Sequence, residues 1–273
     1  MKRLSVFLVC MVIALGLLAA GCGGSDKAAA PQAPKADAAP DVKAIKDRGV
    51  LKVGVKVDVP KFGFKDPQTN KIDGLEIDIA RAIAKKILGD PAKIDVQGVT
   101  AKTRGPLLDN GEVDLVIATF TITEERKQSY NFSQPYFKDG VAMMVKKSTG
   151  MQSVKDMNGK KIGVAQSATS RKALQEEADK AGVKVQFLEF GTYPEIKTAL
   201  DSGRVDVFSV DGSILAGYLD DSTVILPDRF SPQEYGVASK KANTALAATV
   251  DEVVAELKKS GELDKLIQKW GIK

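Results

Sequence analysis

The stretch Leu108-Asp109-Asn110-Gly111-Glu112-Val113-Asp114-Leu115 decides the fold, because it returns as Leu200-Asp201-Ser202-Gly203-Arg204-Val205-Asp206-Val207. Upstream of each copy stands a second similar pair, Lys52-Val53-Gly54-Val55 and Lys161-Ile162-Gly163-Val164. Each half of the chain therefore begins with a buried-strand pattern and later repeats a helix end, a glycine and a strand. The repeat is longer than the roughly 20–50 residues of a solenoid unit. The pattern predicts two similar α/β lobes with a ligand cleft at the ends of their strands.

Hydrophobic periodicity predicts strands alternating with helices in both halves. Leu75, Ile79 and Ile83 lie four residues apart and predict an amphipathic helix that ends before Gly89. The predicted strands cover 51–57, 94–99, 113–119, 141–145, 161–165, 185–190 and 205–210, and the main predicted helices cover 41–48, 75–88, 194–200, 245–258 and 263–270. Two crossings of the chain, near 136–141 and 234–239, predict a hinge between the lobes.

The N-terminus has the pattern of a secretion signal. Lys2 and Arg3 precede an apolar run over 4–18, which is short for a membrane span. The run ends in Leu18-Ala19-Ala20-Gly21-Cys22, which resembles the bacterial lipobox, although its leucine stands one place farther from the cysteine than usual. We expect residues 1–21 to be a lipoprotein signal peptide and Cys22 to carry the lipid. The alternative is an ordinary secretory signal cleaved near Ala20.

Residues 22–40 consist mostly of alanine, glycine, proline, lysine and aspartate. This composition gives the segment nothing to bury, so it predicts a flexible tether. A tether implies a body held outside the cytoplasm at a bacterial membrane, in the periplasm or at the cell surface, through a lipid anchor alone.

Composition excludes several classes of function. The chain has 2 cysteines and no histidine, and both cysteines precede the body. Disulfides, Cys or His metal sites, cysteine nucleophiles and histidine triads are therefore excluded there. The phosphate-binding and dinucleotide-binding glycine motifs are absent from the sequence, so we expect no cofactor and no metal. The net charge of +5 is scattered along the chain, which argues against nucleic-acid binding.

Polar residues follow the strands at the predicted cleft. When the two copies are aligned, Thr119 of the first lobe falls opposite Asp211 of the second, each just beyond a strand. The other polar residues that the pattern places near these strand ends are Lys56, Arg104, Thr121, Arg126, Thr169 and Ser170.

Several motifs resemble one family. Ala118-Thr119-Phe120-Thr121-Ile122-Thr123-Glu124-Glu125-Arg126 and Tyr130-Asn131-Phe132-Ser133-Gln134-Pro135-Tyr136 are similar to the signature of periplasmic binding proteins for polar amino acids, which serve ABC importers. Gly74-Leu75-Glu76-Ile77-Asp78-Ile79-Ala80 is similar to the same family. The resemblance covers the body from about Asp41 to the C-terminus. Lys56, Thr103-Arg104 and Tyr193-Pro194 resemble its aspartate/glutamate-binding branch.

The resemblance implies the type II periplasmic-binding-protein fold, an α/β fold whose two lobes are joined by a two-strand hinge. The expected division of the body is a first lobe over 41–138, a second lobe over 139–234 and a return to the first lobe over 235–273. We also expect a monomer that delivers its ligand to the permease of an ABC importer.

The resemblance also implies roles for the site residues. Arg126 and Thr121, with Thr169 and Ser170, would hold the ligand's α-carboxylate. Asp211 and Thr119 would hold its ammonium. Lys56, Arg104 and Tyr193 would surround its side chain. The chemistry is consistent, because a guanidinium fits a carboxylate with two parallel hydrogen bonds and helix N-terminal amides attract anions.

Each residue also has a structural interpretation. Arg126 would pair with an acid on its own helix, and Asp211 would only cap the helix after it. Lys56 and Arg104 would be solvated surface cations, Tyr193 would contribute to packing only, and the threonines would be plain strand residues.

The sequence departs from the family pattern at two positions. Where many family members have an acid and an aromatic residue, this chain has Lys56 and Val59.

The sequence therefore predicts a receptor for aspartate or glutamate. Arg126 and Asp211 balance an amino-acid head group, so Lys56 and Arg104 remain as two cations without an assigned partner, and a ligand carboxylate would compensate them. The alternatives are a receptor for a neutral polar amino acid such as glutamine, a dehydratase-like enzyme on the same fold, and an adhesion or signalling protein. An enzyme would need a cleft carboxylate besides Asp211, and the sequence shows none.

Overall fold

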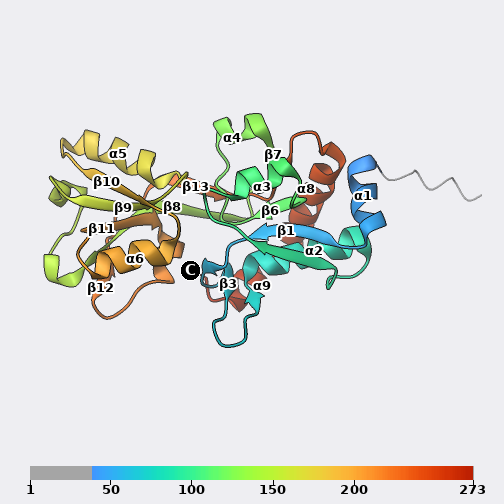
Figure 1. The fold of residues 1–273 in the computed structure, drawn as a ribbon, viewed down its shortest axis with the longest axis horizontal. Helices are drawn as coiled ribbons and strands as arrows, with labels where there is room; N and C mark the ends of the chain where they lie inside the picture. Colours follow the sequence, from blue (N-terminus) through green and yellow to red (C-terminus); the bar gives the residue numbers. More distant parts are fainter. Residues whose placement is uncertain (1–38, 273) are drawn as a thin grey trace, which may run out of the picture. The chain divides into compact units, whose positions relative to one another are not determined.

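The computed structural model describes residues 39–272, which contain two large β-sheets with helices packed on them and one small three-stranded sheet (Figure 1). The predicted signal peptide, most of the tether and Cys22 lie outside these residues. Among residues 39–272 no helix combines the length and the apolar character needed to cross a bilayer.

The first sheet has the strand order β5-β1-β6-β14-β7. Its parallel strands are β1 (Leu51–Val55), β5 (Ile94–Gly98) and β6 (Leu115–Ile117), and its antiparallel strands are β14 (Ala238–Lys240) and β7 (Tyr130–Phe132). The helices of this part are α1 (Pro40–Arg48), α2 (Leu75–Leu88), α3 (Arg104–Asn110), α4 (Glu124–Ser129), α8 (Thr244–Lys259) and α9 (Glu262–Lys269). A small meander of β2 (Asp58–Val59), β3 (Gly63–Lys65) and β4 (Ile72–Asp73) adjoins it.

The second sheet has the order β10-β9-β11-β8-β12, with β13 paired to β8. Its strands are β8 (Phe137–Lys146), β9 (Lys161–Ala165), β10 (Gln186–Phe190), β11 (Val207–Asp211), β12 (Thr223–Ile225) and β13 (Phe230–Tyr235). Its helical segments are η1 (Lys147–Thr149), η2 (Val154–Met157), α5 (Ser170–Ala181), α6 (Tyr193–Asp201) and α7 (Gly212–Ala216). Three parallel strands thus stand in the same order in both sheets, β5-β1-β6 and β10-β9-β11, which confirms the two-lobe α/β fold predicted from the repeat.

The repeated aspartates, Asp114 and Asp206, form the same hydrogen bonds to the first parallel strand of their own sheet. Asp114 accepts a hydrogen bond from the backbone N–H of Lys52 at 2.9 Å, and Asp206 accepts one from Lys161 at 2.8 Å. The backbone N–H of each aspartate donates in return to the carbonyl of the same lysine. The helix before each strand ends near a glycine in the left-handed conformation, Gly111 or Gly203, which this residue type adopts without steric cost.

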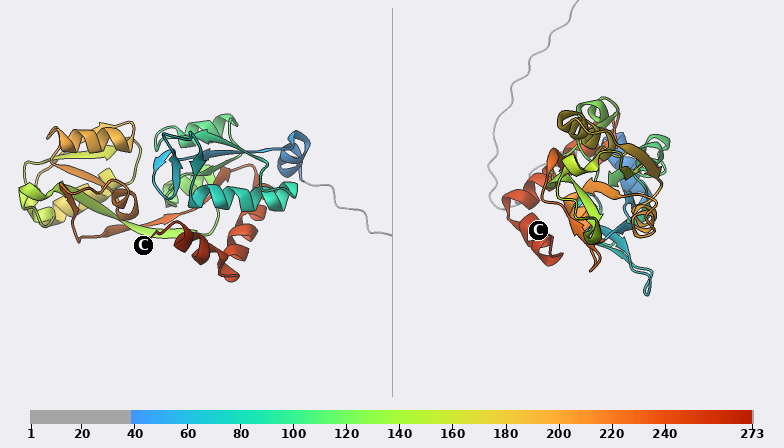
Figure 2. Two further views of the ribbon diagram at one scale, coloured as in Figure 1. Left: turned by 90° about the horizontal axis from the view of Figure 1, so that it is seen from below. Right: turned by 90° about the vertical axis from the view of Figure 1, so that its left-hand side faces the viewer.

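Two antiparallel strands connect the lobes. β8 and β13 pair from Phe137–Tyr235 to Val141–Phe230, with a register shift between Phe230 and Pro232, and run together between the two sheets (Figures 1 and 2). β8 is longer than the predicted strand over 141–145, because the hinge segment continues directly into the second sheet. The boundaries 41–138, 139–234 and 235–273 stay a prediction, with which this strand membership agrees.

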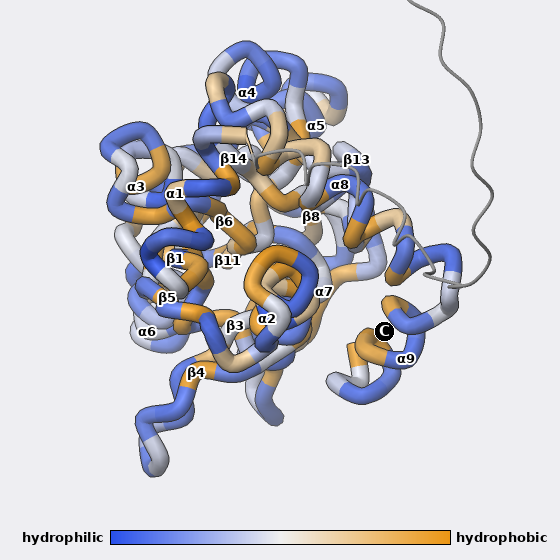
Figure 3. The backbone as a smooth tube through the Cα atoms, turned by 90° about the vertical axis from the view of Figure 1, so that its right-hand side faces the viewer, coloured by the Kyte–Doolittle hydropathy of each residue, from blue (hydrophilic) through white to orange (hydrophobic). Residues whose placement is uncertain are grey.

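The inner strands carry the apolar cores. Leu51, Val53 and Val55 of β1 and Val207 of β11 are fully buried. Figure 3 shows hydrophobic segments along β6 and α7, whereas the hairpin at β4 is largely hydrophilic. The predicted helix over 75–88 is α2, and its buried residues include Leu75, Ile79 and Ile83.

Candidate functional site

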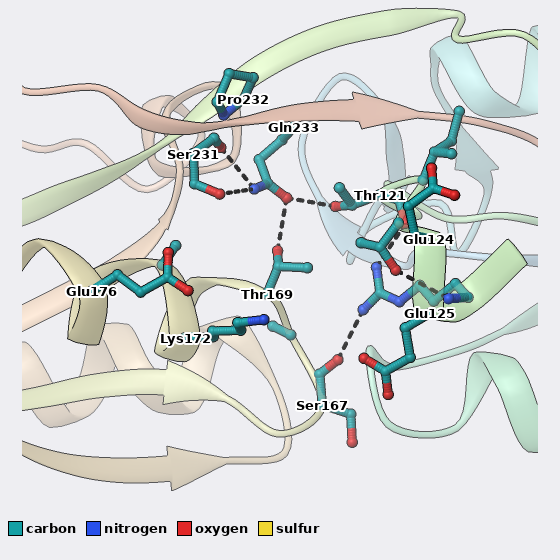
Figure 4. A pocket seen from close by; sticks show the side chains of 15 residues that line it. Thr121, Glu124, Glu125, Ser167, Thr169, Lys172, Glu176, Ser231, Pro232 and Gln233 are labelled. Carbon is teal, nitrogen blue, oxygen red and sulfur yellow. Dashed lines mark hydrogen bonds between the residues drawn. The ribbon is translucent and has the colours of Figure 1, made fainter.

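The mouth of the site is a pocket of about 700 Å³ between the lobes. It is lined by α4 from the first lobe, by the start of α5 from the second and by the hinge strand β13 (Figure 4). Three predicted ligand contacts line it, namely Thr121, Arg126 and Thr169. The remaining predicted residues lie deeper and are buried.

Arg126 joins the two lobes at this mouth. Its backbone N–H donates to the hydroxyl of Thr123 at 3.1 Å, and Thr123 is the N-cap residue of α4. One guanidinium nitrogen donates to the Thr121 carbonyl at 2.8 Å, and the other donates to the Ser167 carbonyl of the second lobe at 3.1 Å. Burial, followed by the nearby charge of Arg104, lowers the pKa of Arg126 to about 9. Arg126 forms no ion pair with an acid of its own helix among the described residues, so that interpretation is wrong.

Gln233 of β13 is a site residue that the sequence analysis missed. Its side-chain carbonyl accepts hydrogen bonds from Thr121 in the first lobe and Thr169 in the second, both at 2.7 Å (Figure 4). Its amide nitrogen donates to the Ser231 carbonyl at 2.8 Å. One buried amide on the hinge therefore contacts both lobes at the predicted carboxylate site.

Arg104 begins α3 and lies inside the first lobe with 3 % of its surface exposed. Its Nη1 donates to the carbonyls of Ala118 and Thr119 at 2.6 and 3.0 Å. Its guanidinium and that of Arg126 lie 4.2 and 4.7 Å from the centre of the Phe120 ring. Burial lowers the pKa of Arg104. Within residues 39–272 no carboxylate forms an ion pair with it.

Thr119 and Glu76 meet beside Arg104. Thr119 lies two residues beyond the end of β6 and has φ +42°, a left-handed conformation that is uncommon outside glycine and concentrates at functional sites. Its backbone N–H donates to Glu76 at 2.5 Å, and the Tyr136 hydroxyl donates to the same oxygen at 2.7 Å. Burial raises the pKa of the fully buried Glu76 carboxyl. The sequence analysis found no cleft carboxylate besides Asp211, and Glu76 corrects that statement.

Lys56 has a partner in the structure, which corrects the charge count made from the sequence. Its ammonium lies 2.9 Å from the Asp58 carboxylate and 4.6 Å from the centre of the Tyr193 ring. Its exposed surface is 1 %, so it is not the solvated strand-end lysine of the alternative interpretation. Burial lowers the pKa of Lys56, and Asp58 opposes that effect. With Arg126 assigned to the head group of the ligand, Arg104 is the one remaining cation of the cluster that forms no ion pair within residues 39–272, where the sequence count had two.

The lobes also touch on this side of the cleft. Asp58 accepts a hydrogen bond from the backbone N–H of Tyr193 at 3.3 Å, and its carbonyl accepts one from the Tyr218 hydroxyl. Gly217 faces Pro60 so closely that a Cβ atom there would lie 3.0 Å from the proline ring. Tyr193 is buried against Phe208, so it serves packing and also contacts the site.

Asp211 ends β11, is buried and does not cap α7 with its side chain. Asp139 takes that role by accepting from the backbone N–H of Ser213 at 2.8 Å. The carboxylate of Asp211 accepts from the Tyr235 hydroxyl at 2.5 Å. Burial raises the pKa of Asp211 to about 7, although the bond from Tyr235 lowers it.

Ser170 and Thr169 stand at the start of α5. Thr169 occupies the N-cap position but makes no side-chain cap bond, because its hydroxyl donates to Gln233. The first amides of this 12-residue helix therefore lack a side-chain acceptor, and helix N-termini in that state attract anions.

Apart from Asp58 Oδ1, which faces the Lys56 ammonium, four buried polar atoms of the cluster have no hydrogen-bond partner within the described residues. They are Glu76 Oε2, Arg104 Nε, Thr119 Oγ1 and Ser170 Oγ. Buried polar groups in proteins are almost always paired. Among residues 39–272 no set of three Cys, His, Asp or Glu side chains is arranged for a metal. The unpaired atoms, with charges of both signs between two hinged lobes, form a candidate binding site for a small polar solute.

Comparisons with known proteins agree with this class. Residues 51–273 match the family described as bacterial extracellular solute-binding proteins, family 3, and the chain belongs to that family. It is 38 % identical to the ABC transporter glutamine-binding protein GlnH of Bacillus subtilis (strain 168), over 98 % of this chain and 97 % of that protein. It is 44 % identical to the glutamine-binding protein of Geobacillus stearothermophilus, over 72 % of this chain and 75 % of that protein.

A solved structure of an ancestral arginine-binding protein bound to arginine is 38 % identical, with a TM-score of 0.73 over 82 % of this chain and 99 % of that one. The periplasmic-binding-protein fold predicted from the sequence is thereby confirmed. The chain is an amino-acid-binding receptor of an ABC importer and not an enzyme, since its relatives are substrate-binding proteins.

Proposed function

We propose that the receptor binds an acidic amino acid, aspartate or glutamate. The observation that carries this proposal is Arg104, a buried guanidinium with an unpaired Nε and no carboxylate partner among the described residues. Burying an uncompensated cation is costly. A side-chain carboxylate of the ligand would supply the missing charge and would accept from Nε.

The other charged groups of the cluster leave the positive charge of Arg104 uncompensated, so that a ligand carboxylate can compensate it. Lys56 is compensated by Asp58, and Arg126 with Asp211 would balance the zwitterionic head group. Glu76 is the remaining acid near Arg104. Burial raises the pKa of the Glu76 carboxyl, although the hydrogen bonds from Tyr136 and Thr119 oppose this effect. A neutral Glu76 would leave the charge of Arg104 to the ligand.

The head group would lie between the lobes. Arg126, Thr121 and the start of α5 at Thr169 and Ser170 would hold the α-carboxylate. Asp211 and the hydroxyl of Thr119 would hold the ammonium. Contacts from both lobes would favour the closed arrangement when the ligand is bound.

Glutamine is the second candidate. An ionised Glu76 would compensate Arg104, and an uncharged amide would then fit the site better than a carboxylate. The two relatives named for glutamine support this reading.

Calorimetric titration with aspartate, glutamate, asparagine and glutamine separates the two candidates. The proposal expects the acids to bind more tightly than their amides. Arg104→Met should weaken the binding of the acids by about 2–5 kcal/mol, or at least about 30-fold in Kd. It should also reduce the difference in Kd between the acids and their amides. The control is Arg171→Gln, which removes an exposed arginine paired with Glu189. Tight glutamine binding without a response to either acid would overturn the acidic assignment.

We also propose that Cys22 is lipidated and that the receptor is a monomer tethered outside the cytoplasm. The lipobox-like sequence and the apolar run before it support the anchor. Cys22→Ala should transfer the protein from the membrane fraction to the soluble fraction, and equal partitioning of variant and parent would refute lipidation.

A further inference from the structure

We propose that Asp58 sets the selectivity between acidic and amide ligands, because it neutralises Lys56 inside the cleft. The inference deepens the proposed function and rests on it in one respect, namely that the side chain of the ligand lies beside Lys56. No motif in the sequence analysis assigned Asp58 a role.

The pair is built into the junction of the lobes. Lys56 follows β1 and Asp58 begins β2, so the two side chains extend from neighbouring positions of one short connection. Their charged groups lie 2.9 Å apart, and their side chains are 2 % and 12 % exposed. With so little solvent around the pair, screening is weak and each charge strongly affects its neighbour.

The second lobe fixes the position of Asp58. Its other carboxylate oxygen accepts the first backbone N–H of α6, from Tyr193, at 3.3 Å. An anion at a helix N-terminus is stabilised by the helix dipole. The Tyr218 hydroxyl holds the backbone carbonyl of Asp58 at the same place. Asp58 therefore compensates Lys56 whenever the lobes have this arrangement.

The consequence concerns the charge presented to a ligand. The charged groups around Lys56 are Asp58, Arg104 and Glu76, with the Tyr193 ring on one side. With Asp58 ionised, Lys56 adds little net positive charge, and Arg104 alone discriminates a carboxylate from an amide. Without the charge of Asp58, both cations would attract a ligand carboxylate. Asp58 thus makes the preference for acidic over amide ligands smaller than it would be if Lys56 and Arg104 both acted on the ligand.

The test is Asp58→Asn, which has the same size and keeps an oxygen that can accept from Tyr193. Kd is measured by calorimetry for glutamate and glutamine, and for aspartate and asparagine, below neutral pH. The informative quantity is the ratio of the amide Kd to the acid Kd, in which effects on the shared head group cancel. We expect the ratio to rise by about tenfold or more, the size expected when an additional charge-assisted contact of about 1.4 kcal/mol becomes available.

A double-mutant cycle separates this role from a structural one. In a Lys56→Met background, Asp58→Asn should raise the ratio clearly less, because it then removes only the repulsion between Asp58 and the ligand carboxylate and releases no cation. A ratio that does not rise in the single variant, or that rises equally with and without Lys56, would overturn the proposal. Asp73→Asn is the matched control, since Asp73 pairs with Arg81 at 2.8 Å on the half-exposed surface of the same lobe and should not change the ratio.

The two proposals fail in distinguishable ways. The preference of the unaltered protein tests the acidic assignment, whereas the change in the ratio on Asp58→Asn tests the role of Asp58. A parent that prefers glutamine would refute the first proposal, and a shift of its Asp58→Asn variant toward glutamate would still support the second.

Discussion

Acidification should weaken ligand binding through Asp211. Burial raises the pKa of this carboxyl to about 7, but an ammonium group of a ligand would require the ionised form. A bound ammonium favours the carboxylate, so the pKa of Asp211 in the complex lies below that in the free protein. Asp211 must therefore lose a proton on binding whenever the pH is below about 7.

The size of the change in Kd follows from the difference between the pH and the pKa of Asp211. Above about pH 7 the carboxylate is already ionised, and Kd should be constant. Below it, Kd should rise by about tenfold per pH unit until the pH reaches the pKa of the complex. From about pH 7 to about pH 5 the loss is at most about 100-fold, or about 2.7 kcal/mol.

The assay is calorimetry over this range in buffers that differ in ionisation enthalpy, which also counts the released protons. Close to one proton should be released per ligand at the acidic end, apart from protons of the ligand itself. Asp211→Asn should bind weakly with a nearly flat profile. A parent Kd that stays constant from about pH 8 to about pH 5, without proton release, would refute the role of Asp211 as the ammonium partner.

Three further perturbations test other parts of the structure. Gln233→Leu leaves two threonine hydroxyls without their shared acceptor, which typically costs about 1–3 kcal/mol per buried group; it should weaken binding by calorimetry, and an unchanged Kd would refute a role in the site. Gly217→Val places methyl groups against Pro60 and should increase the ligand-bound radius of gyration in small-angle scattering; equal compaction of variant and parent would contradict it. Asp206→Ala, like Asp114→Ala, removes a hydrogen bond from the aspartate side chain to the first parallel strand of its own sheet. The bond lies outside the candidate site, so the melting temperature should fall at unchanged Kd.

The repeat predicted the arrangement of the lobes because its residues act locally. Asp114 and Asp206 each bond to the first strand of their own sheet, so the same short segment gives the same strand order twice. The helix over 75–88 was predictable for a similar reason, since its apolar stripe and its terminal glycine lie within one segment. The strand over 113–119 is shorter in the structure, because Thr119 leaves the β conformation to bond with Glu76.

The charge balance of the site was not predictable, because it depends on contacts between distant segments. Glu76 stands beside the apolar stripe of its helix, and only the packing of Tyr136 and Thr119 shows that it is buried at the cleft. Gln233 reaches the site through the pairing of β13 with β8. The predicted second crossing over 234–239 begins one residue after it. Asp58 stands two residues after Lys56 in the sequence, but only the bend between β1 and β2 brings its carboxylate to the Lys56 ammonium.

The strand β8 determines where the chain can bend. Val141, Met143 and Val145 are fully buried. Residues 141–145 of β8 pair with β11 on one edge, and residues 144–146 pair with β12 on the other. Twisting it would break two hydrogen-bond ladders at once. The torsion that separates the lobes is therefore confined to Phe137–Gly140 and to the irregular pairing at Phe230 and Pro232. We therefore expect the second lobe to rotate as a rigid body about an axis through these few peptide units.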